Sequence, residues 1–208
     1  VDRNFSDNNW YYENGGRIGV MTSNGCALKC AYCMEPKCKG KMFLRSPQLV
    51  VAEIDQLVEQ GIMDIHFTDS ECNIPLVHAK DILETIAARS YPKELKFWSY
   101  AQILPFDEEY AVLAEKAGVT GILFSTDHID SSMLKSFGKG YEAEDIIQTT
   151  RLCNDHGILV FHELLFGMPG DNLEKIKKAI DFMRELDPYV TGITVGVGII
   201  PGCPLSED

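Results

Sequence analysis

Three cysteines stand close together near the start of this chain, at Cys26, Cys30 and Cys33. Their spacing, C-x3-C-x2-C, brings three thiolates within reach of one another on one short loop. The number is informative, because structural zinc sites and ordinary iron–sulfur clusters take four protein ligands. A loop with three cysteines can hold a [4Fe–4S] cluster in which one iron is left open. An iron without a protein ligand can take part in a reaction.

A structural zinc site is the alternative for these cysteines, and it would take a fourth thiolate or histidine at suitable spacing. Cys38 could supply that ligand by sequence alone, although the chain has no second C-x-x-C pair. The chain has seven cysteines, an odd number, and no signal peptide opens it. Such thiols are reduced, metal-binding or buried more often than paired. We therefore expect a cytoplasmic protein, and no membrane span, because no apolar run approaches ~20 residues.

The length and the charge of the chain limit its classes of function. Its 208 residues suit one domain. Its formal net charge of -12 argues against general nucleic-acid binding, because phosphate recognition needs a basic face. One basic cluster follows the cysteines, at Lys37, Lys39, Lys41 and Arg45. We interpret it as a solvated loop, and an anion site beside the cysteines is the alternative.

Short apolar runs alternate with helical patterns from Arg17 onward. The expected strands cover residues 18–22, 62–67, 95–101, 121–125, 158–166 and 192–199. The expected helices cover residues 46–60, 77–88, 107–117, 131–137, 143–156 and 172–186. This alternation predicts βαβ units with right-handed crossovers and a parallel sheet. We predict an α/β fold, a partial (β/α)6 TIM-like barrel, over residues 17–208, preceded by a lead-in over residues 1–16. We expect this core to be cut from a longer protein.

Polar and glycine-rich residues follow the expected strands. In parallel sheets, ligands bind outside the carboxyl ends of the strands. The segments found there are 68–73, Tyr100 with Gln102, 125–128, 167–171 and 201–204. One edge of the sheet therefore combines thiolates, carboxylates, an amide and glycine turns. That combination suits a polar ligand that carries an amine and hydroxyls.

At this point the chain resembles the radical S-adenosylmethionine (SAM) superfamily. The resemblance covers residues 15–205 and begins with the cysteine motif, in which Tyr32 precedes the last cysteine. Asp69-Ser70-Glu71 lies where the family has a Gly-Gly-Glu motif that holds the SAM amino group. Asp127-His128 lies where related members carry a Glu/Gln-Ser pair. Lys139-Gly140 takes the place of an Arg-Gly pair that can contact the SAM carboxylate.

Further markers follow in the order that the family has them. Gly167-Met-Pro-Gly170-Asp171 matches a Gly-x-Pro-Gly-(Glu/Asp) turn, and residues 201–205 are similar to Pro-Gly-Thr-Pro-Leu. Gly15-Gly16 and the Asp-Ser-Glu-x-Asn run at 69–73 resemble members that carry a cobalamin-binding domain before the barrel. The Asp-x-His-x-x-Gly signature of that domain is absent from these residues. Asp69-Ser70 also departs from the family's two glycines, and Cys203 replaces a threonine.

The resemblance implies a mechanism and a set of site residues. Cys26, Cys30 and Cys33 would ligate three irons of a [4Fe–4S] cluster. SAM would chelate the fourth, and its reductive cleavage would give a 5′-deoxyadenosyl radical for C–H modification. The expected cofactor-binding residues are Asp69, Ser70, Glu71, Gln102, Asp127, His128, Lys139, Gly167 and Gly170.

The resemblance leaves the reaction and the substrate open. Methyl transfer with cobalamin, through a domain absent here, is the favoured reaction. The alternatives are cobalamin-independent oxidation or rearrangement, and a structural metal-binding module without SAM chemistry. We expect a small-molecule or peptide substrate and an electron donor such as flavodoxin or ferredoxin.

Overall fold

The computed structural model describes residues 1–206, so the last two residues of the predicted core, 207 and 208, lie outside the described part. Its main sheet has six strands in the order β1-β4-β5-β6-β7-β8, and every neighbouring pair is parallel. The strands are β1 (Ile18–Val20), β4 (Asp64–Phe67), β5 (Lys96–Ala101), β6 (Val119–Asp127), β7 (Leu159–Phe166) and β8 (Val190–Val195). This sheet confirms the predicted α/β fold with a partial barrel.

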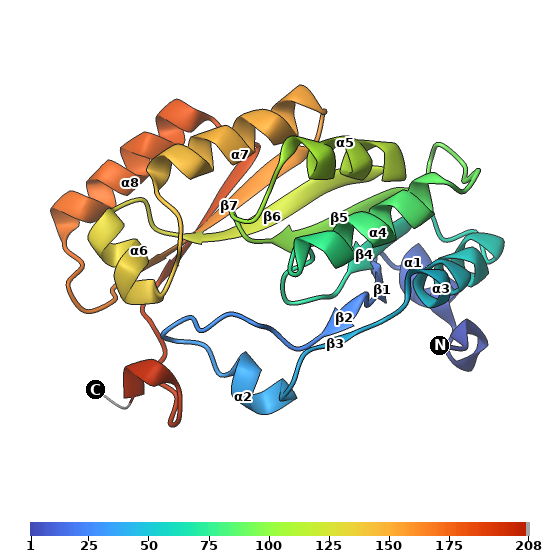
Figure 1. Cartoon of the computed structure of the whole chain (residues 1–208), viewed down its shortest axis with the longest axis horizontal. Coiled ribbons are helices and arrows are strands. Elements are labelled where there is room, and N and C mark those ends of the chain that lie inside the picture. Colours follow the sequence, from blue (N-terminus) through green and yellow to red (C-terminus); the bar gives the residue numbers. More distant parts are fainter. Residues whose placement is uncertain (207–208) are drawn as a thin grey trace.

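Helices cover one side of this sheet, and the cysteine segment lies on the other side (Figure 1). The helices of the barrel are α3 (Pro47–Glu59), α4 (Leu76–Ala87), α5 (Glu108–Ala117), α6 (Ser131–Phe137), α7 (Ala143–Asp155) and α8 (Leu173–Leu186). The hydroxyl of Ser46 caps α3, with Pro47 at its first position, as predicted. Left-handed Gly118 ends α5. No helix within residues 1–206 is long and apolar enough to cross a membrane.

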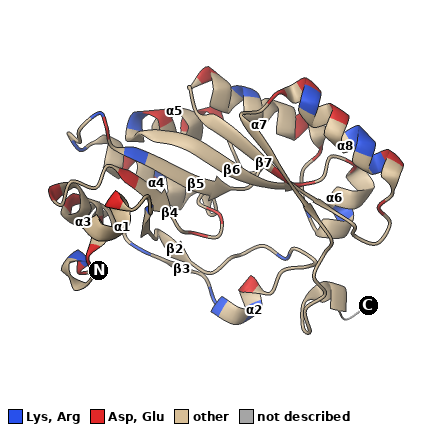
Figure 2. Ribbon diagram, turned by 180° about the vertical axis from the view of Figure 1, so that it is seen from behind, with Lys and Arg blue, Asp and Glu red and all other residues tan. Residues whose placement is uncertain are grey.

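The cysteines lie on a segment whose own structure was not predicted. A two-residue strand β2 (Ser23–Asn24) pairs antiparallel with β3 (Phe43–Leu44) and closes the base of this segment. Between them, the short helix α2 (Glu35–Lys39) begins two residues after Cys33. Figure 2 shows the same arrangement from behind, with α2 and the β2–β3 ribbon facing the sheet from the side opposite α5, α7 and α8. The ribbon therefore holds the cysteines against the open side of the barrel.

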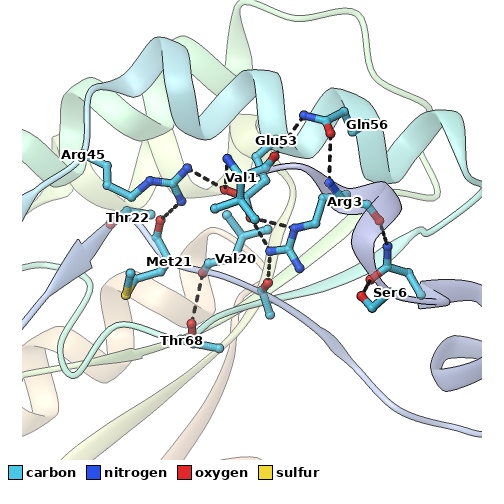
Figure 3. A network of polar contacts seen from close by, with 12 residues as sticks. Val1, Arg3, Ser6, Val20, Met21, Thr22, Arg45, Glu53, Gln56 and Thr68 are labelled. Atoms are coloured by element: carbon cyan, nitrogen blue, oxygen red, sulfur yellow. Dashed lines mark hydrogen bonds and ion pairs between the residues drawn. The ribbon is translucent and has the colours of Figure 1, made fainter.

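The lead-in is tied to the barrel by a buried carboxylate (Figure 3). It contains a 3-10 turn, η1 (Arg3–Phe5), and the helix α1 (Asn8–Glu13). Glu53 on α3 is 2% exposed and accepts hydrogen bonds from the guanidinium groups of Arg3 and Arg45, at 2.6 and 2.5 Å. Arg45 also donates to the carbonyl of Met21. The interpretation of Arg45 as part of a solvated basic loop is therefore wrong, because Glu53 draws its guanidinium into the protein.

All six strands depart from the predicted bounds, and the departures at β6 and β8 have a visible structural basis. β6 begins at Val119 and continues to Asp127, because its pairing with β7 resumes beyond an irregularity between Phe124 and Asp127. β8 ends at Val195, short of the predicted Ile199, and Gly196 follows it with φ +98°. Within residues 1–206, β8 is an edge strand that pairs only with β7, and it is largely exposed. The apolar residues that follow Val195 therefore do not lengthen the strand.

Candidate active site

The three cysteines of the motif are free thiols at or near the protein interior. Cys30 is 8% exposed, and Cys26 and Cys33 are half-buried. The backbone N–H of Glu35 donates a 3.4 Å hydrogen bond to Cys33 Sγ. Burial raises the pKa of the Cys26 thiol, and it raises that of Cys30 to about 11. A coordinating metal centre would therefore be needed to hold these sulfurs as thiolates.

The middle of the cysteine loop is fastened to β6 and α6. The Tyr32 hydroxyl donates a 2.7 Å hydrogen bond to Asp127 Oδ2, at the last residue of β6. The Tyr32 ring also meets the ring of Phe137 edge to face, with 5.7 Å between centroids. The backbone of the loop passes so close to Gly138 that a Cβ there would lie 3.0 Å from the Lys29 carbonyl oxygen. The ends of β6 and α6 therefore form a seat for the cysteine loop.

A row of buried polar side chains runs beneath this seat, from β6 to the loop after β4. Lys139 Nζ lies 3.1 Å from Asp127 Oδ2 and 3.5 Å from Gln102 Oε1. Gln102 Nε2 in turn donates to Glu71 Oε1. Within residues 1–206, the second oxygen of Glu71 is buried without a hydrogen-bond partner. Burial raises the pKa of this carboxyl to about 7, although the side chains of Gln102 and Ser125 and the charge of Lys139 lower it. Four of the predicted residues are thus brought together, with one acceptor left for a ligand.

Asn73 positions this row, although it was not among the expected cofactor-binding residues. Its side chain is fully buried and donates hydrogen bonds to the carbonyls of Gln102 and Pro105, at 2.7 and 2.6 Å. Its Oδ1 accepts the backbone N–H of Gln102 at 3.0 Å. The loops that follow β4 and β5 are therefore joined through one amide, which fixes the backbone that carries Gln102.

Asp69 and Ser70 are neighbours in the sequence but differ in their hydrogen bonding. The Asp69 carboxylate accepts hydrogen bonds from the backbone N–H and hydroxyl groups of both Thr22 and Ser23. It therefore links the end of β4 to the start of the cysteine segment. The Ser70 hydroxyl is buried and has no hydrogen-bond partner within residues 1–206. A SAM contact from either residue stays a prediction.

His128, Gly167 and Gly170 form a second group, on the loops after β6 and β7. The Nδ1 atom of His128 accepts the backbone N–H groups of the two residues that follow it, and its Nε2 lies 3.6 Å from Asp171 Oδ1. The Gly167 N–H donates to the other oxygen of Asp171. Gly167 and Gly170 have φ values of +92° and +90°, which favour glycine. Met168, between them, is buried in an apolar cluster that includes Tyr32, so the turn borders the cysteine loop.

The donor set fits an iron–sulfur cluster better than a single ion. Within residues 1–206, no three His, Cys, Asp or Glu side chains converge on one position suited to a metal ion. A cluster does not need such convergence, because each of its irons takes its own thiolate. Three free thiols, an N–H group donated to Cys33 Sγ and a buried cation near Cys30 match the groups that hold and tune such clusters.

The comparison with protein families shows the family of this chain. The model of the radical SAM superfamily matches residues 20–183, from the end of β1 to within α8. The chain belongs to the radical SAM superfamily. The matched range includes the three cysteines and every expected cofactor-binding residue. The resemblance inferred from the motif is therefore confirmed, and so is the partial barrel as the family's fold.

Two radical SAM relatives share much of this sequence. Tryptophan 2-C-methyltransferase from Streptomyces laurentii is 41% identical over 97% of the chain. The radical SAM methyltransferase TsrM from Kitasatospora setae, solved with cobalamin and a [4Fe–4S] cluster bound, is 40% identical over 96% of the chain, with a TM-score of 0.91. The chain spans only 36% of the first relative's length and 37% of the second chain.

A more distant structure shares the fold. The cobalamin-dependent SAM radical enzyme OxsB, with aqua-cobalamin bound, is 21% identical over 88% of this chain and has a TM-score of 0.66. At that identity the likeness concerns the fold alone. It shows that the radical SAM barrel described here is kept while the sequence diverges.

Proposed function

We propose that this chain is the cluster-binding and SAM-binding core of a radical SAM methyltransferase that works with cobalamin. One observation carries the proposal: the cysteine loop lies over a buried row of Asp127, Lys139, Gln102 and Glu71, and the outer oxygen of Glu71 has no hydrogen-bond partner in the described part of the chain. The likeness to TsrM, solved with cobalamin and a [4Fe–4S] cluster, supports the assignment.

The roles of the chain's own residues follow from their positions. Cys26, Cys30 and Cys33 hold three irons, and the backbone N–H donated to Cys33 Sγ stabilises the thiolate. The cluster and SAM, when bound, supply electron transfer and a methyl group or a 5′-deoxyadenosyl radical. Glu71 receives the ammonium of SAM on its unpartnered oxygen, since a cation there would complete a buried carboxylate. Gln102 orients that carboxylate through its other oxygen.

We propose an aromatic amino acid, tryptophan or a close analogue, as the substrate class. The Streptomyces laurentii relative acts on tryptophan by its name, and a TsrM structure holds a tryptophan substrate and a SAM analogue. The strand residues on the side of the sheet opposite the helices include His66, Trp98, Tyr100 and Phe161, which are less buried than their neighbours in sequence. This aromatic face suits a flat apolar ring better than a charged sugar or a peptide backbone.

We also keep two predictions about the setting of the enzyme. A low-potential donor such as flavodoxin or ferredoxin would supply the electron for reductive cleavage. All seven cysteines are free, which suits a reducing compartment such as the cytoplasm.

The test is anaerobic reconstitution of the chain with iron and sulfide, followed by separate measurements of SAM binding and turnover. We expect cluster absorbance, SAM binding, and loss of both in Cys30→Ala. With reductant, free cobalamin and tryptophan present, S-adenosylhomocysteine would report methyl transfer, and 5′-deoxyadenosine would report hydrogen abstraction. A correctly folded chain that takes up only zinc and binds no SAM would overturn the proposal.

A further inference from the structure

We propose that Lys139 and Asp127 act as an opposed pair of charges that sets the reduction potential of the cluster on this loop. Lys139 would favour the reduced cluster and Asp127 the oxidised one. The inference rests on the proposed function, because it requires the three cysteines to hold a cluster. The effect of Lys139 on the reduction potential would not depend on any contact between Lys139 and SAM.

Both charges are almost completely removed from water. The side chain of Lys139 is 2% exposed and that of Asp127 is 7% exposed. Each has polar contacts inside the protein: Lys139 Nζ donates to the Ser125 carbonyl at 3.0 Å, and Asp127 accepts the Tyr32 hydroxyl at 2.7 Å. Charges in such surroundings act over several ångströms with little screening, unlike charges on the surface.

The pair lies close to the loop that carries the middle cysteine of the motif. Ala31 donates its backbone N–H to the Phe137 carbonyl at 3.0 Å, and Gly138 packs against the backbone of Lys29 and Cys30. Lys139 follows immediately, and its ammonium lies 3.1 Å from Asp127 Oδ2. Tyr32, between Cys30 and Cys33, reaches Asp127 from the same loop. Both charges are therefore tied to the ligand loop by short contacts and cannot move away from it independently.

The two charges would act in opposite directions on a cluster held by this loop. Reduction adds one negative charge to the cluster. The buried ammonium of Lys139 stabilises that added charge, and the buried carboxylate of Asp127 opposes it.

Variants that remove one charge at a time test this inference. Asp127→Asn keeps the shape and can still accept the Tyr32 hydroxyl, and asparagine tolerates the φ of +58° at this position. Lys139→Met removes the ammonium and keeps most of the length, and Lys139→Arg keeps the charge. Exposed Lys177→Met and Asp155→Asn on the outer helices are matched controls. The midpoint potential of the reconstituted chain is measured without SAM. The measurement is made at alkaline pH, where the buried carboxyl groups of Asp127 and Glu71 stay ionised.

We expect the midpoint potential to rise in Asp127→Asn and to fall in Lys139→Met. Each shift should reach about 59 mV, a tenfold change in the ratio of reduced to oxidised cluster for one electron. Lys139→Arg and both surface controls should stay at the wild-type potential. Opposite signs are diagnostic, because both single variants break the same ion pair. Loss of packing alone would move the two potentials in the same direction.

Three results would count against the pair. Shifts of the same sign, or no shift in either folded variant, would overturn this inference while leaving the proposed function intact. A wild-type chain that binds no cluster would overturn both. Circular dichroism and thermal melting establish folding, and if Lys139→Met does not fold, a potential in Asp127→Asn that fails to rise overturns the inference by itself.

Discussion

The hydroxyl of Tyr32 donates a 2.7 Å hydrogen bond to Asp127 Oδ2, although the two residues are 95 positions apart in the chain. Tyr32 stands between two cysteines of the motif, and Asp127 ends the fourth strand of the main sheet. Asp127 has a left-handed backbone with φ +58°, a conformation that aspartate adopts more readily than most residues. Together with the contacts of the loop to Phe137 and Gly138, this hydrogen bond holds the cysteine loop at the strand ends, where the polar row begins.

Replacing Tyr32 with phenylalanine should loosen that loop. The change removes a hydrogen bond to a buried carboxylate, so we expect a loss of about 2 kcal/mol in the free energy of unfolding. Urea unfolding of the cluster-free chain measures it, with exposed Tyr11→Phe as the matched control. A Tyr32→Phe chain as stable as the control would show that the contact does not hold the loop.

Glu71 should make the stability of the cluster-free chain depend on pH. Burial raises the pKa of its carboxyl from an ordinary 4.5 to about 7 in the folded chain. The folded state therefore holds a proton that the unfolded state has released, and this contribution is full below the unfolded pKa. It is lost as pH rises through the folded pKa, and amounts to at most about 3 kcal/mol.

The variant Glu71→Gln isolates this effect, because it stays uncharged at every pH. Relative to that variant, the wild-type chain should lose stability between about pH 5 and about pH 8. Subtracting the two unfolding curves removes the contributions of all other titrating groups. A difference that stays flat over this range would contradict the raised pKa of the buried Glu71 carboxyl.

Asn73 should be required for stability as well as for the site. Asn73→Ala leaves the Gln102 N–H and two backbone carbonyls without their partners in the interior. We expect a loss of about 3 kcal/mol, since each unsatisfied buried group costs on the order of 1–3 kcal/mol. The exposed Asn154→Ala, on α7, serves as the control in chemical denaturation. Equal stability of the two variants would mean that water replaces the lost contacts.

Glu53 should bind the lead-in to the barrel. Glu53→Ala leaves the guanidinium groups of Arg3 and Arg45 unpaired in partly buried positions. Breaking a buried ion pair from one side costs about 3–5 kcal/mol. Hydrogen exchange should show faster exchange in η1 and α1 than in the wild-type chain. Protection that is unchanged in residues 3–13 would show that the lead-in is held by other contacts.

The sequence predicted the parts of this protein that local signals determine. The cysteine spacing predicted the ligand loop, and the alternation of apolar runs with helical patterns predicted the parallel strands and the helices between them. These features depend on neighbours a few positions away. Strands β2 and β3 could not be predicted, because a strand of two residues shows no periodicity in the sequence. The two strands form only where the tertiary structure brings them together.

The connections within the site could not be predicted from local patterns. Tyr32 and Asp127, or Asn73 and Gln102, meet only after the barrel has formed. Glu53 did carry a signal: it stands on the buried side of α3 between Val50 and Ile54, where a carboxylate requires partners. A charged residue at an apolar position of a helix was thus the sequence signal that pointed to the buried network around Arg3 and Arg45.

We expect three thiolates of this loop to hold a [4Fe–4S] cluster with one iron that no protein side chain ligates. Mössbauer spectroscopy of the chain, reconstituted anaerobically with isotopically enriched iron, measures whether they do. We predict one cluster of four irons per folded chain, with one iron site distinct from the other three, and no such cluster in Cys30→Ala. Mononuclear iron, or no bound iron in a folded wild-type chain, would contradict the account.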